Sequence, residues 1–253
     1  MTLAKRLSQV SPLLPDWMDT LALGAWGVLM MKYWLTGRLG LLIHPNYFGL
    51  TIGAGLLLLV MTGLNLQKLL RGKPQIGVRH FTLFPPGWMS MVLLVSALLG
   101  LWITPRPFAS ETALERGLQD SALLTRAQPQ TFRPNADPAA RSLIDWVRTL
   151  DVYPEPDAYS GQPVQVQGFA VHTPNLPDAY LMLTRFVITC CAADAYPVGL
   201  PVKLPQSRQA YPPDQWFDVS GQMVTETLDD RRQLVIAAET LQGIPAPRNP
   251  YAY

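Results

Sequence analysis

The sequence predicts a membrane α plus soluble β protein, in which three N-terminal transmembrane helices precede a linker and a small five-stranded OB-like barrel. Two stretches without any Asp, Glu, Lys or Arg, residues 39–67 and 81–103, indicate helices that lie in hydrocarbon. Beyond residue 161 apolar residues instead alternate with polar ones, which is typical of half-buried strands. The 24 prolines, most of them after Pro105, favour short elements and extended connections in this second half.

The predicted transmembrane domain covers residues 1–108. Crossing the hydrocarbon core takes roughly 20 residues of helix. Apolar segments of about this length predict three crossings, at about residues 17–35, 47–66 and 86–103. In the second of them, Gly49, Gly53 and Gly55 would allow another helix to approach closely, although membrane helices also simply tolerate glycine.

The positions of Lys and Arg predict the orientation of these helices. With three crossings, the N-terminus and the loop after the second helix share one side of the membrane. Positively charged segments stay in the cytoplasm, so the more positive side is expected to be cytoplasmic. This side would carry Lys5, Arg6, Lys68, Arg71, Lys73 and Arg79, against Lys32, Arg38 and Arg106 on the other. The prediction is a multi-pass protein of the cell membrane with a cytoplasmic N-terminus and an extracytoplasmic C-terminal domain.

Residues 109–138 are predicted to form a Pro-rich linker, with a short helix at about 110–124. The following domain, residues 139–253, opens with a second helix at 139–150. Leu143, Ile144, Val147 and Leu150 share one face of that helix, with Trp146 at its border. We expect this face to pack on a neighbouring part of the protein.

The remaining residues of that domain are predicted to form five short strands. Their patterns lie at about residues 164–169, 180–189, 198–204, 215–223 and 233–239. Five strands without a long helix between them favour the OB-like barrel, and a small sandwich is the alternative. The fold alone does not indicate a function.

Cys190 and Cys191 are the only cysteines, and they stand at the end of the second predicted strand. Adjacent side chains of a strand point to opposite faces, so the two thiols converge only where the strand ends or bulges. Thiolates bind Zn(II), and a neighbouring carboxylate or imidazole completes such a site. The sequence therefore predicts a metal site of Cys190, Cys191, Asp194 and His172, with Zn as its ion. A redox-active vicinal disulfide and two merely packed cysteines are the alternatives.

Several function classes are disfavoured by the sequence. It contains no Gly-rich phosphate loop, no HExxH and no GxSxG, so we expect no enzyme. A net charge of +2 and the lack of a Lys/Arg cluster interleaved with aromatics argue against a nucleic-acid partner. Membrane association and solute binding are the functions that the sequence still favours.

The segment Arg185–Leu200, which contains the cysteine pair, resembles the signature of the YcgQ-like family of bacterial membrane proteins. Ile43–Phe48, Thr104–Pro107 and Pro245–Tyr253 resemble other segments of that family, so the likeness spans nearly the whole chain. The resemblance implies an accessory subunit of a two-component permease, with a separate multi-helix permease as its partner.

Together these observations predict an accessory membrane subunit. Its extracytoplasmic domain is expected to bind a metal ion or another solute at the mouth of the permease. Two alternatives remain open. One is a structural or assembly protein without a ligand, and the other is a thiol redox protein that uses the vicinal cysteines.

Overall fold

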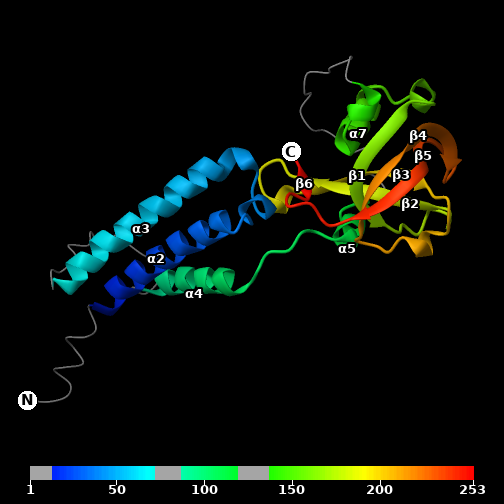
Figure 1. The fold of residues 1–253 in the computed structure, drawn as a ribbon. Coiled ribbons are helices and arrows are strands. Elements are labelled where there is room, and N and C mark those ends of the chain that lie inside the picture. The colour runs from blue at the N-terminus through cyan, green and yellow to red at the C-terminus, as the bar shows by residue number, and fades with distance from the viewer. Residues whose placement is uncertain (1–12, 72–86, 119–136) are drawn as a thin grey trace, which may run out of the picture. The chain divides into compact units, whose positions relative to one another are not determined.

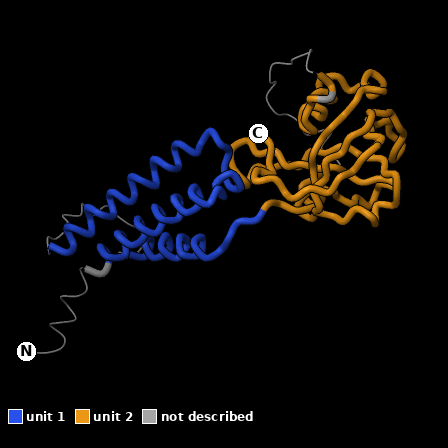
Figure 2. The backbone as a smooth tube through the Cα atoms, viewed as in Figure 1, with its two compact units in different colours: residues 1–106 blue, residues 107–253 orange. Residues whose placement is uncertain are grey.

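The chain divides into two compact units at the bond between Arg106 and Pro107 (Figure 2). The computed structural model describes residues 13–71, 87–118 and 137–253. In the described residues unit 1 is helical, whereas unit 2 is built on a β-sheet (Figure 1).

Unit 1 contains three described helices, α2 (Leu13–Leu35), α3 (Phe48–Leu70) and α4 (Trp88–Trp102). Helix α2 packs against both of the others. Its approach to α3 is close, because a Cβ on Gly27 would lie 2.9 Å from the Leu59 side chain. A Cβ on Gly55 would lie 2.6 Å from a methionine methyl group of α2. Gly49 and Gly53 have no described atom within 4 Å. Of the three glycines expected to allow close approach of another helix, Gly55 is therefore in close contact with α2 of the same unit.

Polar side chains of α2 bond to the backbone of α4. The ammonium group of Lys32 donates to the carbonyl oxygen of Leu101, and the Tyr33 hydroxyl donates to that of Gly100 at 2.5 Å. The last carbonyls of a helix lack partners within the helix and carry partial negative charge, so a cation is favourable there. Lys32, which the sequence suggested would extend toward a membrane interface, therefore makes a contact within the unit.

The expected three N-terminal crossings are wrong for the described residues. Within residues 13–71, 87–118 and 137–253, one stretch, the 26 residues Pro45–Leu70, is long and apolar enough to cross a membrane. Helix α4 has 15 described residues, short of the roughly 20 required, and the predicted start at Pro86 lies outside the described residues. Helix α2 has the length, but Asp16, Asp19 and Lys32 lower its mean hydropathy. The charge count that predicted the orientation assumed three crossings, so it no longer applies.

Unit 2 is organised around six strands in the order β1-β4-β5-β3-β2-β6, with a further pairing between β1 and β2. Most neighbours are antiparallel, but β3–β5 and β2–β6 are parallel. The strands are β1 (Pro163–Val171), β2 (Tyr180–Val187), β3 (Tyr196–Lys203), β4 (Trp216–Leu228), β5 (Arg231–Ile244) and β6 (Tyr251–Ala252).

The predicted five-stranded OB-like barrel is likewise corrected to a six-stranded mixed sheet. All five predicted strands are present. The sixth comes from the C-terminal tail, where Tyr251 pairs with Phe186 of β2. A strand of two residues is too short to show alternation, and parallel partners are selected by contacts distant in sequence. Neither feature leaves a local pattern that the sequence could reveal.

Helix α7 (Leu143–Val152) covers part of this sheet, packing on β1, β2 and β3. A capping box starts the helix, since the Ser142 side chain accepts from the Asp145 amide and the Asp145 carboxylate accepts from the Ser142 amide. Of the predicted apolar face, Leu143, Ile144 and Val147 are buried, and Leu150 is partly buried against the same core. Trp146, predicted to border that face, is completely buried in the core.

Candidate metal site on the cysteine loop

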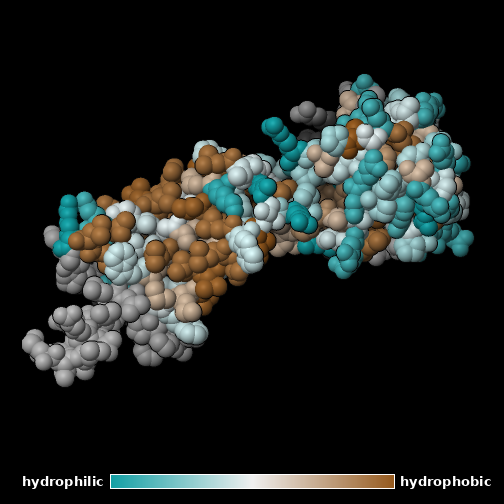
Figure 3. All heavy atoms as spheres, turned by 60° about the horizontal axis from the view of Figure 1, so that its bottom comes forward, coloured by the Kyte–Doolittle hydropathy of each residue, from teal (hydrophilic) through white to brown (hydrophobic). Residues whose placement is uncertain are grey.

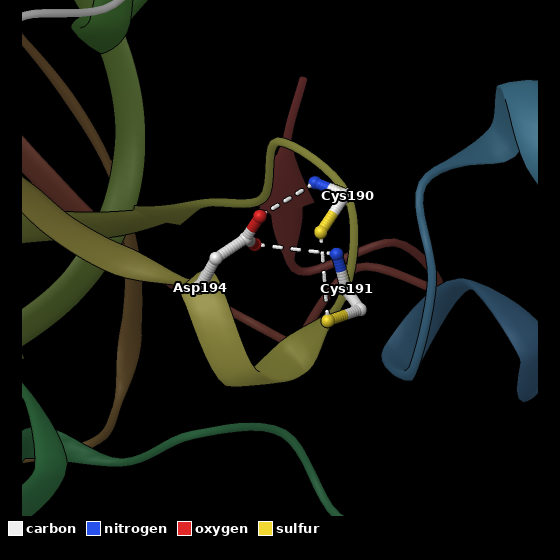
Figure 4. A group of neighbouring side chains, drawn as sticks. All are labelled: Cys190, Cys191 and Asp194. Atoms are coloured by element: carbon white, nitrogen blue, oxygen red, sulfur yellow. Dashed lines mark hydrogen bonds between the residues drawn. The ribbon is translucent and has the colours of Figure 1, made fainter.

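The cysteine pair lies on the connection between β2 and β3, residues 188–195, which we call the cysteine loop. Strand β2 ends at Val187, before the cysteines, and the loop closes with a short 3-10 turn at Ala192–Asp194. The Cys190 side chain is exposed and that of Cys191 is half-buried. Because the strand has already ended, the alternation of side chains no longer applies, and the two thiols lie close together (Figure 4).

The Asp194 carboxylate organises this loop. One of its oxygens accepts the amides of Thr189 and Cys191 at 3.3 and 3.2 Å. The other accepts the Thr189 hydroxyl at 2.5 Å and the Cys190 amide at 2.8 Å. Figure 4 shows the carboxylate directed at the backbone amides of both cysteines. A carboxylate has about four lone-pair sites, so these four donors use most of its capacity to accept hydrogen bonds.

The charge state of Asp194 follows from these contacts. Partial burial raises the pKa of the carboxyl group, but hydrogen bonds from Cys190, Thr189 and Cys191 outweigh burial and lower this pKa to about 2. Asp194 is therefore a carboxylate at neutral pH, and it fixes the backbone from which both thiols project.

The two sulfur atoms are 3.6 Å apart, and both cysteines are free thiols. Two Zn–S bonds of about 2.3 Å in a tetrahedral site place their sulfurs about 3.8 Å apart, close to the observed separation. A disulfide instead requires about 2.05 Å. One ligand atom each from Cys190, Cys191 and Asp194 all lie within 4.8 Å of one another. The donor set and its spacing thus fit a thiophilic ion.

Cys190 favours its protonated form. A hydrogen bond with Asp194, a second with Cys191 and the nearby negative charge raise the pKa of this thiol to about 12. Since a thiolate is the form that binds metal, an ion has to displace this proton.

His172 does not join the group. It follows β1, and its Nε2 lies 2.8 Å from the carbonyl oxygen of Tyr211. Of the four residues predicted for the metal site, the structure therefore brings together Cys190, Cys191 and Asp194.

Sequence reasoning missed two residues that support the loop. Thr189 contributes its hydroxyl and amide to Asp194, and Arg116 donates to the carbonyls of Ala192 and Ala195. Thr189 is adjacent to the cysteines and could have been found from its position. Arg116 lies more than 70 residues away, so no local pattern indicates it.

Comparison with known proteins identifies the part of the chain that carries this loop. Residues 142–253 match the family described as the DUF1980 C-terminal domain. No curated protein and no solved structure matches significantly. The matched residues include α7, the six strands and the cysteine loop. Unit 2 therefore contains a DUF1980 C-terminal domain, which fits a YcgQ-like family at a coarse level.

Proposed function

We propose that this chain is a membrane-anchored accessory subunit of a permease, and that its DUF1980 domain binds Zn(II) through Cys190 and Cys191. The observation that carries the proposal is the pair of thiols 3.6 Å apart on a loop held by the hydrogen-bonded Asp194 carboxylate. Thiolate sulfur is a preferred ligand of this ion.

The proposed site would provide two sulfur ligands and leave room for exchange. Asp194 could become a third ligand only by giving up one of its hydrogen bonds, and its present role is to orient the thiols. Solvent, a solute or a partner protein would then supply the remaining positions of a tetrahedral ion. A site with few ligands from its own chain suits capture and release better than permanent structural binding.

The membrane part of the proposal rests on Pro45–Leu70, which is long and apolar enough to cross a bilayer and is little buried by the rest of the described residues. The resemblance to YcgQ-like proteins supports a multi-helix permease as the partner. Near this crossing, Lys32 and Arg38 precede the helix, whereas Lys68, Arg71, Lys73 and Arg79 lie at its end or follow it, so the nearby charges favour a cytoplasmic unit 2. Lys5 and Arg6, which lie further from the helix, favour the opposite, extracytoplasmic placement. A reporter fused after Tyr253 measures on which side of the membrane unit 2 lies.

Zinc titration of the purified full-length protein in detergent tests the metal site. We expect about one ion per chain, with affinity falling as the pH decreases, because protons compete for the thiolates. Replacing both cysteines (Cys190→Ser with Cys191→Ser) should weaken binding by more than about 100-fold.

A matched control is His172→Gln, which removes a potential ligand of unit 2 that lies outside the group. This variant should bind zinc as the wild type does. Equal zinc binding by the wild type and the double serine variant would eliminate the proposed cysteine site. Loss of zinc binding in His172→Gln but not in the double serine variant would place the zinc site at His172.

The packing alternative has less support, because Cys190 is exposed and contributes little to the core. A redox thiol, like a zinc ligand, acts as a thiolate, so the raised pKa of Cys190 does not separate the redox alternative from the proposed zinc site.

A further inference from the structure

The first twelve residues of unit 2, 107–118, which we call the exit segment, pack against the sheet of that unit. The Phe108 ring lies 5.1 Å from that of Phe186 on β2 and 5.7 Å from that of Tyr251 on β6. The Phe108 amide donates to the Tyr251 hydroxyl at 3.1 Å. Phe108, the last residue of the predicted transmembrane domain, is therefore docked on the sheet of unit 2, beside the strand that leads into the cysteine loop.

The helical part of the exit segment is also anchored. Helix α5 (Ser110–Glu115) starts where the Ser110 amide donates to the Asp214 carboxylate at 2.6 Å. Ala113 and Leu118 are buried, at 0% and 2% exposure. The helix ends at Glu115, earlier than the predicted end near residue 124, and residues 119–124 lie outside the described residues. Arg116 lies between these two residues in the sequence and is half-buried. Its guanidinium group lies 4.7 Å from the centre of the Phe108 ring.

Arg116 reaches the cysteine loop directly. One guanidinium nitrogen, Nη1, donates to the carbonyl oxygen of Ala192 at 3.3 Å and to that of Ala195. These two carbonyls flank Asp194 in sequence. Asp194 in turn accepts the amides of Cys190 and Cys191. Two sets of hydrogen bonds, connected through the backbone of residues 192–195, therefore join the exit segment to the segment that carries both thiols.

We propose that Arg116 is a positioning residue for the cysteine site and couples the docking of the exit segment to metal binding at that site. The inference rests on the proposed metal-binding function and adds its regulation. Hydrogen-bonded supports outside the ligand set commonly contribute 10- to 100-fold to metal affinity. Because coupling between two binding events is reciprocal, an ion that needs the ordered loop should also strengthen the docking of the exit segment.

The geometry explains why an arginine occupies this position. The guanidinium is planar and permanently charged, so one face can stack on Phe108 while an edge N–H group reaches the loop carbonyls. Lysine retains the charge and a donor but lacks the planar group that stacks. Arg116→Lys should therefore keep part of the effect, and Arg116→Gln should lose most of it.

The test compares full-length wild type, Arg116→Gln and Arg116→Lys in detergent. A matched control is Arg232→Gln, which removes ion pairs with Glu155 and Asp157 in the same unit. Amide hydrogen exchange of the metal-free proteins reports on the loop, and Zn(II) affinity and the Co(II)–thiolate charge-transfer band report on the site. Circular dichroism confirms that each variant remains folded.

Arg116→Gln should accelerate exchange of the Cys190 and Cys191 amides, weaken Zn(II) binding by about 10- to 100-fold and alter the Co(II) band. Arg116→Lys should fall between Arg116→Gln and the wild type, and Arg232→Gln should match the wild type. Added Zn(II) should slow exchange in residues 107–118 of the wild type.

Unchanged loop exchange in folded Arg116→Gln would overturn the inference, as would equal effects of Arg116→Gln and Arg232→Gln. Exchange in the metal-free protein separates this failure from that of the proposed function. If the wild type binds neither Zn(II) nor Co(II), the proposed function fails and the coupling falls with it, while loop exchange still decides whether Arg116 positions the loop.

Discussion

The two units place their apolar side chains in opposite ways. In unit 1 large hydrophobic residues are exposed along all three described helices, with Leu50 at 74% and Leu57 at 60%, and Figure 3 shows the resulting hydrophobic surface. In unit 2 residues of the same kind point inward, and Leu181 and Leu183 are completely buried. In unit 1 a polar group of α2, the Lys32 ammonium group, forms a hydrogen bond with the backbone of α4. An exposed apolar surface of this size marks a contact with a membrane or with another protein, whereas unit 2 buries its apolar residues in its own core.

The largest expected effect tests this contrast with one substitution made in both units. Leu183→Ala leaves a cavity in the packed core of unit 2 and should destabilise it by about 2–5 kcal/mol. Leu57→Ala removes a side chain that touches little, and should change stability by less than about 0.5 kcal/mol in detergent. Denaturant titrations of the full-length protein, followed by circular dichroism, measure both. Similar losses would show that the exposed face of unit 1 is packed against something in solution.

A smaller effect is expected for glycines within α3. Gly55→Leu forces a side chain into the contact with α2 and should destabilise the helices by about 1–3 kcal/mol. Gly53→Leu faces no described neighbour, so it should leave the isolated protein as stable as the wild type. Thermal unfolding of the helices in detergent distinguishes the two. If Gly53→Leu instead reduces copurification of a permease, this face of α3 is the partner contact.

The smallest expected effect concerns the carboxyl group of Asp151 in unit 2. Burial raises the pKa of Asp151 on α7 to about 6, although the charge of Arg148 opposes the shift. A raised carboxyl pKa means that the folded state disfavours the charged form, so stability decreases as the pH rises from about 4 to 6. Asp151→Asn should therefore be more stable at pH 7, by about 0.5 kcal/mol after solvent screening, since the group is partly exposed.

The gain in Asp151→Asn should disappear below about pH 4, where the wild-type carboxyl group is protonated in both the folded and unfolded states. Melting temperatures at pH 4 and pH 7 measure this difference. A gain that is independent of pH would assign the effect to packing.

Much of the local structure could be predicted because it depends on periodicity. The helical patterns, the five longer strands and the buried face of α7 all follow from residues that are close in sequence. The number of membrane crossings was overestimated for a related reason. Apolar composition shows that a segment avoids water, but it does not distinguish lipid from a neighbouring helix, and Lys32 of α2 bonds to one.

For the candidate site, the residue types alone indicate the chemistry: two adjacent thiols and a carboxylate three residues later, in a segment where a strand ends in a turn. The arrangement of these groups depends instead on how the chain folds. Asp194 lies close enough in sequence to hold both cysteine amides, whereas His172 bonds to Tyr211 away from them. Arg116 and the strand at Tyr251 reach the loop region from segments distant along the chain. Such contacts form only when chain folding offsets the entropy of closing long loops, and this depends on the whole core rather than on local pattern.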